Sequence, residues 1–210
     1  MPVTDYLVRN AELYPDEVAL VELNPDEKDT RRTTWKEFDL IQPINNMPYR
    51  REITWSVFNE KANRFANMLI SRGVKKGDKV AILMYNCLEW LPIYFGVLKT
   101  GAIAVPFNFR YDSDEIYYCA ELAQVDVIVF GFAFIGRIEV NAERLSRGRL
   151  LIYVGDNCPS FAESYHELVA DCSSKEPDVK ITEDVPEVPQ FRGHLKFQLP
   201  GAPASPQAVL

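Results

Sequence analysis

The chain has 210 residues, of which 47% are hydrophobic and 25% charged, and 23 basic against 30 acidic side chains give a net charge of −7. This composition is ordinary for a folded protein and excludes collagen-like, wholly disordered and disulfide-scaffold classes. It also argues against a nucleic-acid partner, because there is no surplus of Lys and Arg to neutralise phosphates.

The first 52 residues mix ordered and irregular patterns. Helical spacing of apolar residues predicts a helix over 4–14, with Thr4 as the candidate cap, and VALVEL predicts a strand over 18–23. Residues 24–52 are rich in charge, Pro and Asn, and are interpreted as a surface excursion that contains one short strand over 33–38.

The clearest element is a helix from Thr54 to Arg72. Thr54 is its candidate cap, and Gly73 follows the last turn, where a left-handed residue is favoured. The residues predicted to share its apolar face are Phe58, Ala62, Phe65, Ala66 and Leu69. The next strand, 80–84, is apolar without alternation, which indicates burial on both faces of a parallel sheet.

Helices and strands then alternate. Helices are predicted over 87–100, 112–123, 135–147 and 160–172, and strands over 102–107, 125–130 and 149–154. This alternation predicts an α/β fold: a layered, mainly parallel sheet flanked by helices on both faces.

The character of the sequence changes near its C-terminal end. Six of the fourteen prolines fall between Pro177 and Pro206, and no Asp or Glu follows Glu187. We therefore expect an N-terminal α/β subdomain over 1–184 and an irregular Pro-rich tail over 185–210.

Common catalytic and binding motifs are missing. Residues 73–79 (GVKKGDK) lack the phosphate-loop spacing and follow a helix, so they predict a turn. The sequence contains no G-x-G-x-x-G and no G-x-S-x-G, and His166-Glu167 does not begin a zinc-protease motif because position 170 is Ala. No catalytic or metal-binding residue is predicted from these patterns.

The cysteines and the apolar stretches bear on location. The most apolar stretch, 91–98, is far shorter than the ~20 residues that a membrane span needs. The four cysteines match no zinc or redox spacing: Cys87, Cys119, Cys158 and Cys172. We expect reduced thiols in a cytoplasmic protein without a membrane span.

One loop is a candidate ligand-binding edge. Asn108 and Arg110 follow a strand that ends at Pro106, and polar groups at the carboxyl edge of a parallel sheet commonly bind ligands. The alternative is that these two side chains only satisfy the loop backbone.

Several phrases occur in the order typical of one family. They are a Thr-aromatic phrase before the long helix (53–69), Gly-Asp-x-Val (77–80), Asn86 with Glu89-Trp90, and Leu98-Lys99-x-Gly101-Ala102 running to Pro106. Over roughly residues 1–184 the chain resembles the N-terminal part of the adenylate-forming (AMP-binding) acyl-CoA synthetases. We add Asn86 to Pro106, Asn108 and Arg110 as candidate substrate-edge residues.

The resemblance implies an ATP-dependent ligase of carboxylic or fatty acids. Such an enzyme joins a carboxylate to AMP, releasing pyrophosphate, and then transfers the acyl group to the thiol of CoA. ATP, Mg²⁺ and CoA are the implied cofactors, and a carboxylic or fatty acid is the implied substrate.

The tail departs from the family pattern. A Ser/Thr/Gly-rich phosphate loop ending in Pro-Lys is expected near residues 190–200, but residues 197–207 read FQLPGAPASPQ. A reading-frame shift across about residues 185–207, or a mis-assigned gene end, would explain this tail. No family catalytic, cofactor or metal residue can therefore be carried over.

Three interpretations of function remain at this point. The chain is a truncated ligase subdomain that is inactive alone and binds none of the cofactors tightly, a non-catalytic binding or interaction module, or a structural fragment without a ligand. In the first case an uncovered subdomain face predicts self-association.

Overall fold

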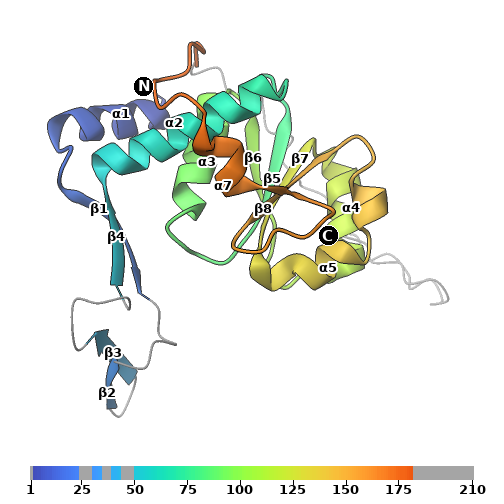
Figure 1. Cartoon of the computed structure of the whole chain (residues 1–210), viewed down its shortest axis with the longest axis horizontal. Coiled ribbons are helices and arrows are strands. Elements are labelled where there is room, and N and C mark those ends of the chain that lie inside the picture. Colours follow the sequence, from blue (N-terminus) through green and yellow to red (C-terminus); the bar gives the residue numbers. More distant parts are fainter. Residues whose placement is uncertain (1, 24–29, 35–38, 44–49, 182–210) are drawn as a thin grey trace, which may run out of the picture.

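Figure 1 shows the computed structural model, which describes residues 2–23, 30–34, 39–43 and 50–181. Its centre is a five-stranded sheet in which all neighbouring strands are parallel. In spatial order the strands are β6 (Ile103–Pro106), β5 (Lys79–Leu83), β7 (Val127–Gly131), β8 (Leu150–Val154) and β9 (Glu163–Ser164). The predicted parallel α/β architecture is confirmed.

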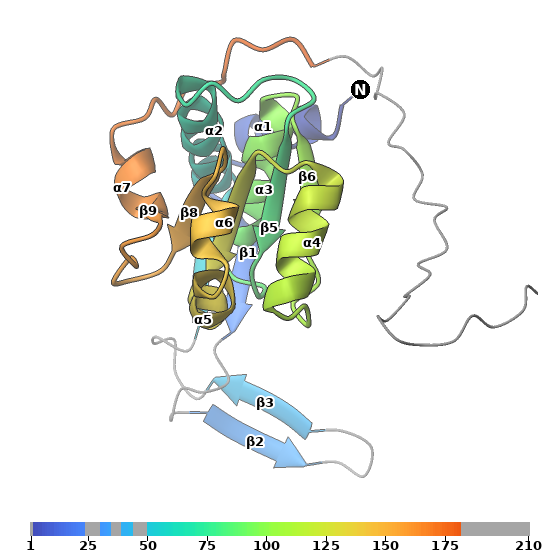
Figure 2. The ribbon, with the colours of Figure 1, turned by 90° about the vertical axis from the view of Figure 1, so that its right-hand side faces the viewer.

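Helices cover both faces of this sheet (Figure 2). Val80 and Ile82 of β5 belong to one apolar core, which is completed by α2 (Trp55–Ser71), α3 (Trp90–Lys99) and α7 (Tyr165–Ala170). Ala81 and Leu83 belong to the other core, with α4 (Ser113–Ala123), α5 (Ile135–Glu139) and α6 (Ala142–Leu145). Because successive residues of β5 point to opposite cores, the strand needs an unbroken apolar run, as predicted.

Helix α2 forms as its sequence pattern predicts. Thr54 caps it, with its Oγ1 accepting a hydrogen bond from the Val57 N–H at 3.3 Å. All five residues of the predicted apolar face are buried. After the helix, Gly73 adopts a left-handed φ of 86°, which ends α2 and turns the chain towards β5.

The N-terminal region differs from the expectation in two places. Helix α1 (Val3–Leu13) begins two residues earlier than expected, with Pro2 at its cap, so Thr4 lies inside the helix and is buried rather than capping it. The two-stranded ribbon of β1 (Val18–Leu23) and β4 (Arg50–Thr54) is antiparallel and extends away from the α/β layers (Figure 1). Residues 50–52 are therefore part of this ribbon and not of an irregular excursion.

A second antiparallel pair lies in the predicted excursion. Its strands are β2 (Thr30–Thr34) and β3 (Asp39–Pro43). Residues 33–34 of the predicted strand over 33–38 belong to β2, and the remaining part of that prediction, residues 35–38, lies outside the described part of the chain.

Two predicted helices are shorter than expected. The helix over 135–147 is divided into α5 and α6 and follows a 3₁₀ turn, η1 (Phe132–Phe134). The helix over 160–172 gives way to β9 followed by α7, because Ser164 caps α7 through a bond from the Glu167 N–H to its Oγ at 3.4 Å. The predicted tail over 185–210 lies outside the described residues, and the domain limits stay predictions.

Candidate site at the carboxyl edge of the sheet

The four candidate residues lie at the ends of two neighbouring strands. Pro106 ends β6 and pairs in register with Ile82 of β5, while the Phe107 N–H donates to the Ile82 carbonyl at 2.9 Å. Asn86 follows β5 by three residues, and the loop after β6 carries the remaining two. All four candidate residues are exposed: Asn86, Pro106, Asn108 and Arg110.

The loop after β6 is organised by Asn108. Its Oδ1 accepts a hydrogen bond from the Arg110 N–H at 3.0 Å, and its carbonyl accepts one from the Tyr111 N–H at 3.0 Å. Asn108 thus builds a turn, which agrees with the reading that it satisfies the loop backbone. The guanidinium of Arg110 lies 5.5 Å from the centre of the Phe109 ring, so that this cation stays at the surface beside an aromatic face.

Three loops of this edge meet through aromatic rings that the sequence analysis did not single out as a group. The Tyr85 ring, after β5, is 5.7 Å from that of Phe109, after β6, and 5.2 Å from that of Phe134, after β7. Phe134 is fully buried, whereas Tyr85 and Phe109 are about half exposed. In the sequence, these three aromatic residues could have been grouped only by position, because each follows closely after a strand of the sheet.

Arg137 of α5 fixes the loop after β6. Its Nη1 donates to the carbonyl of Phe109 at 2.7 Å and to that of Tyr111 at 3.0 Å. Its guanidinium also lies 5.5 Å from the centre of the Phe134 ring. No local pattern could reveal this role, because the residues that Arg137 contacts are 26 and 28 positions away in the chain.

The thiols near this edge are not activated nucleophiles. Burial and the nearby Glu89 carboxylate raise the pKa of Cys87 from 9.0 to about 11. Burial also raises the pKa of Cys119 and of its neighbour Tyr111. Since the thiolate is the reactive form, these groups are unsuited to nucleophilic catalysis near neutral pH. All four cysteines are free.

The described residues do not fit a metal ion. Within them, no group of three or more His, Cys, Asp or Glu side chains is placed to hold one. The carboxyl edge offers exposed rings and guanidinium groups, which suit binding of a flat or anionic group. In the same described part of the chain, no helix is both long and apolar enough to cross a bilayer.

Sequence comparisons relate the chain to known proteins. A family model described as "AMP-binding enzyme" matches residues 7–191. A crotonobetaine/carnitine–CoA ligase from Salmonella enteritidis PT4 is 38% identical over 84 residues, which are 40% of this chain and 16% of that protein. The chain therefore aligns with only a small part of this curated relative.

Solved structures share the fold. The anthranilate CoA ligase AuaEII, in complex with anthranoyl-AMP, has a TM-score of 0.66 at 23% identity, covering 83% of this chain and 30% of that one. The N-terminal domain of FACL13 from Mycobacterium tuberculosis has a TM-score of 0.61 at 22% identity, covering 88% and 40%. A putative long-chain-fatty-acid CoA ligase from Rhodopseudomonas palustris has a TM-score of 0.64 at 26% identity, covering 85% and 39%.

Proposed function

We propose, because the chain belongs to the AMP-binding enzyme family, that residues 1–184 form the first α/β unit of a cytoplasmic carboxylic acid–CoA ligase. The observation that carries this proposal is the family match over residues 7–191, which spans the whole parallel sheet. CoA ligases among the similar proteins support the reaction class.

The proposed reaction has two steps. A carboxylate oxygen of a fatty or other organic acid attacks the α-phosphorus of ATP, and pyrophosphate leaves. The CoA sulfur then attacks the acyl carbon, and AMP leaves. Fatty and aromatic acids are the substrate classes that the related structures suggest.

The contribution of this unit is a binding wall and not the reacting groups. Tyr85 and Phe109 give the carboxyl edge an exposed aromatic surface, and Arg137 holds the loop that carries Asn108 and Arg110. Neither the sequence nor the described residues supply a phosphate loop or a metal site. We propose that the 210 residues by themselves are inactive and bind ATP, Mg²⁺ and CoA weakly.

A chimaera tests the scaffold role. Residues 1–184 replace the corresponding region of the related crotonobetaine/carnitine–CoA ligase, and pyrophosphate release is measured with ATP, Mg²⁺ and a panel of aliphatic and aromatic acids. The 210-residue chain and the complete relative are measured alongside. We expect turnover by the relative and the chimaera, and none by the 210-residue chain.

The arms separate the parts of the proposal. Pyrophosphate release by the 210-residue chain would contradict its inactivity. A folded chimaera without turnover would contradict the ligase scaffold, and calorimetry that detects a carboxylic acid bound to the 210-residue chain would then favour a non-catalytic binding module.

A further inference from the structure

Helix α2 holds an irregular segment that comes after α7. We call residues 171–176 the clasp segment. Asn63 Nδ2 donates to the Ser174 carbonyl at 3.0 Å, and Asn67 Nδ2 donates to the carbonyls of Ser173 and Lys175 at 2.8 and 2.9 Å. Side chains at i and i+4 share one helix face, so two amides of α2 together bind the backbone of this short segment.

Arg64 extends this grip to the start of the clasp segment. Its Nη1 donates to the Cys172 carbonyl at 2.6 Å and to the Ala170 carbonyl, at the end of α7, at 3.3 Å. All the acceptors of these bonds are backbone carbonyls. The attachment therefore depends on the backbone conformation of the clasp segment more than on its side chains.

The far end of the clasp segment neutralises a buried cation. Lys99 of α3 has a side chain that is only 1% exposed, and its Nζ donates to the Asn59 Oδ1 at 2.9 Å and to the Glu176 carboxylate. Asn59, Asn63 and Asn67 are spaced by four residues along α2. One row of asparagines thus binds both the buried ammonium and the backbone of the clasp segment.

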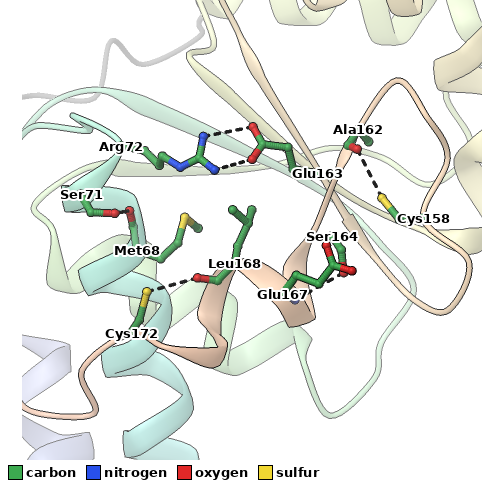
Figure 3. A network of polar contacts seen from close by, with 10 residues as sticks. All are labelled: Met68, Ser71, Arg72, Cys158, Ala162, Glu163, Ser164, Glu167, Leu168 and Cys172. Carbon is green, nitrogen blue, oxygen red and sulfur yellow. Dashed lines mark hydrogen bonds and ion pairs between the residues drawn. The ribbon is translucent and has the colours of Figure 1, made fainter.

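The elements that precede the clasp segment have further contacts. Figure 3 shows the Arg72 guanidinium of α2 paired with both oxygens of Glu163 in β9, and the Cys172 thiol donating to the Leu168 carbonyl of α7 at 3.2 Å. The ion pair attaches β9 to α2 without the clasp segment, whereas the bond from Cys172 joins the start of the clasp segment to α7. The clasp segment itself contains neither helix nor strand.

Packing of the clasp segment against α1 is incomplete. A cleft of about 370 Å³ lies between α1, Lys99 and residues 176–181, and one of about 330 Å³ lies between α1, α2, Ser174 and Glu176. Asn63, which is 2% exposed, has an Oδ1 without a hydrogen-bond partner. Polar bonds rather than apolar packing therefore supply much of the attachment, and such segments open before the core does.

We propose that the clasp segment is a detachable strap, which opens as a unit while α2, α3 and the sheet remain folded. Opening breaks the amide and guanidinium bonds to the backbone, exposes Lys99, and joins the two clefts into one groove along α1. The closed strap fixes the direction in which the chain leaves the α/β unit, and the open strap releases it.

Thiol labelling tests this strap. Cys172 lies in the clasp segment, and Cys119 lies on α4 at the opposite face of the sheet, so the two thiols compare the clasp segment with a distant site in one molecule. Labelling by N-ethylmaleimide is followed by mass spectrometry in the unaltered 210-residue chain and in N67D, which keeps the shape of Asn67 but removes its donor. We expect Cys172 to react about tenfold faster in N67D, and Cys119 at an unchanged rate.

The matched control is S71A, which removes a polar contact within α2, the 2.7 Å bond from Ser71 Oγ to the Met68 carbonyl, without touching the clasp segment. It should leave both rates unchanged. Trypsin cleavage after Lys175 provides a second readout and should accelerate in N67D and in R64A. An unchanged Cys172 rate, or an equal rise at both thiols, would overturn the proposal.

Discussion

At the scale of single residues, Lys99 is a buried cation that needs a counter-ion. Its ammonium group is almost fully buried and its carboxylate partner, Glu176, is 46% exposed. Burial lowers the pKa of Lys99, and Glu176 acts in the opposite direction by favouring the charged form. A buried cation costs several kcal/mol unless it is paired, so this lysine depends on the clasp segment for its charge balance.

A pair of substitutions measures that dependence. E176Q leaves the ammonium buried without its counter-ion and should lower the free energy of unfolding by about 2 kcal/mol, since the half-exposed carboxylate is partly screened. K99M removes the charge while keeping an apolar stem and should cost less. Urea unfolding of E176Q, K99M and the double variant measures this, and an E176Q cost that persists undiminished in the K99M background would contradict it.

Residue roles could be predicted where they act locally. The cap at Thr54 and the capping box of Asp112 with Glu115 follow from patterns within a few positions. The roles of Lys99 and Arg137 could not be found in this way, because their partners lie 77 and up to 28 positions away. Only the fold brings these groups together.

At the scale of elements, the contact between α2 and α3 depends on Gly96. A Cβ built at this position would lie 2.9 Å from the Ala62 carbonyl oxygen and 2.9 Å from the Phe65 ring. The missing side chain lets the two helices approach closely beside the first core. The sequence predicted both helices but not this approach, because a glycine inside an apolar helix does not reveal what it faces.

Two glycine substitutions in helices should have opposite effects. G96A forces α2 and α3 apart and should lower the free energy of unfolding by about 2–3 kcal/mol. G136A, in α5, has no atom within 4 Å of the added Cβ and should raise it by roughly 0.5–1 kcal/mol through better helix propensity. Urea midpoints compare the two, and equal midpoints for both variants would refute the close-packing argument.

Elements with strong periodicity were predicted well, and those fixed by partners were not. Helix α2 and the buried strands β5, β7 and β8 appear close to their expected limits. Strand β9 has two residues and exists through pairing with β8, so it carries too little pattern to detect. At the candidate site, the strand ends were predictable, whereas the joining of three loops by Tyr85, Phe109 and Phe134 required the fold.

At the scale of the whole molecule, buried thiol and phenol groups make the free energy of unfolding depend on pH in the alkaline range. Burial raises the pKa of Cys87 from 9.0 to about 11, and also raises the pKa values of Tyr153 and Tyr165. Such groups hold their protons more tightly when folded. Their contribution is complete below their ordinary pKa values and is lost as the pH rises through the folded values.

Lys99 opposes this trend. Its pKa is lowered, so the folded protein gains stability as this ammonium loses its proton at rising pH. Burial raises the pKa of six described thiol and phenol groups, against the one lysine, and we expect the free energy of unfolding to fall from about pH 9 to about pH 11. Urea titrations across this range measure the effect, with C87A as the variant whose decline should be shallower. A flat profile would contradict the assignment of these buried protons.

The two borders of the sheet carry a consequence for colloidal behaviour. On one side β6 ends with Pro106, which has no N–H to donate to a strand of another molecule. On the other side β9 has only two residues. The two edges of the five-stranded sheet therefore offer few backbone groups for strand pairing between molecules, the contact from which fibrils grow. Assembly of copies at the α/β unit is expected to use exposed apolar side chains such as Phe132 and Val140, which are 73% and 70% exposed, and should be reversed by mild detergent.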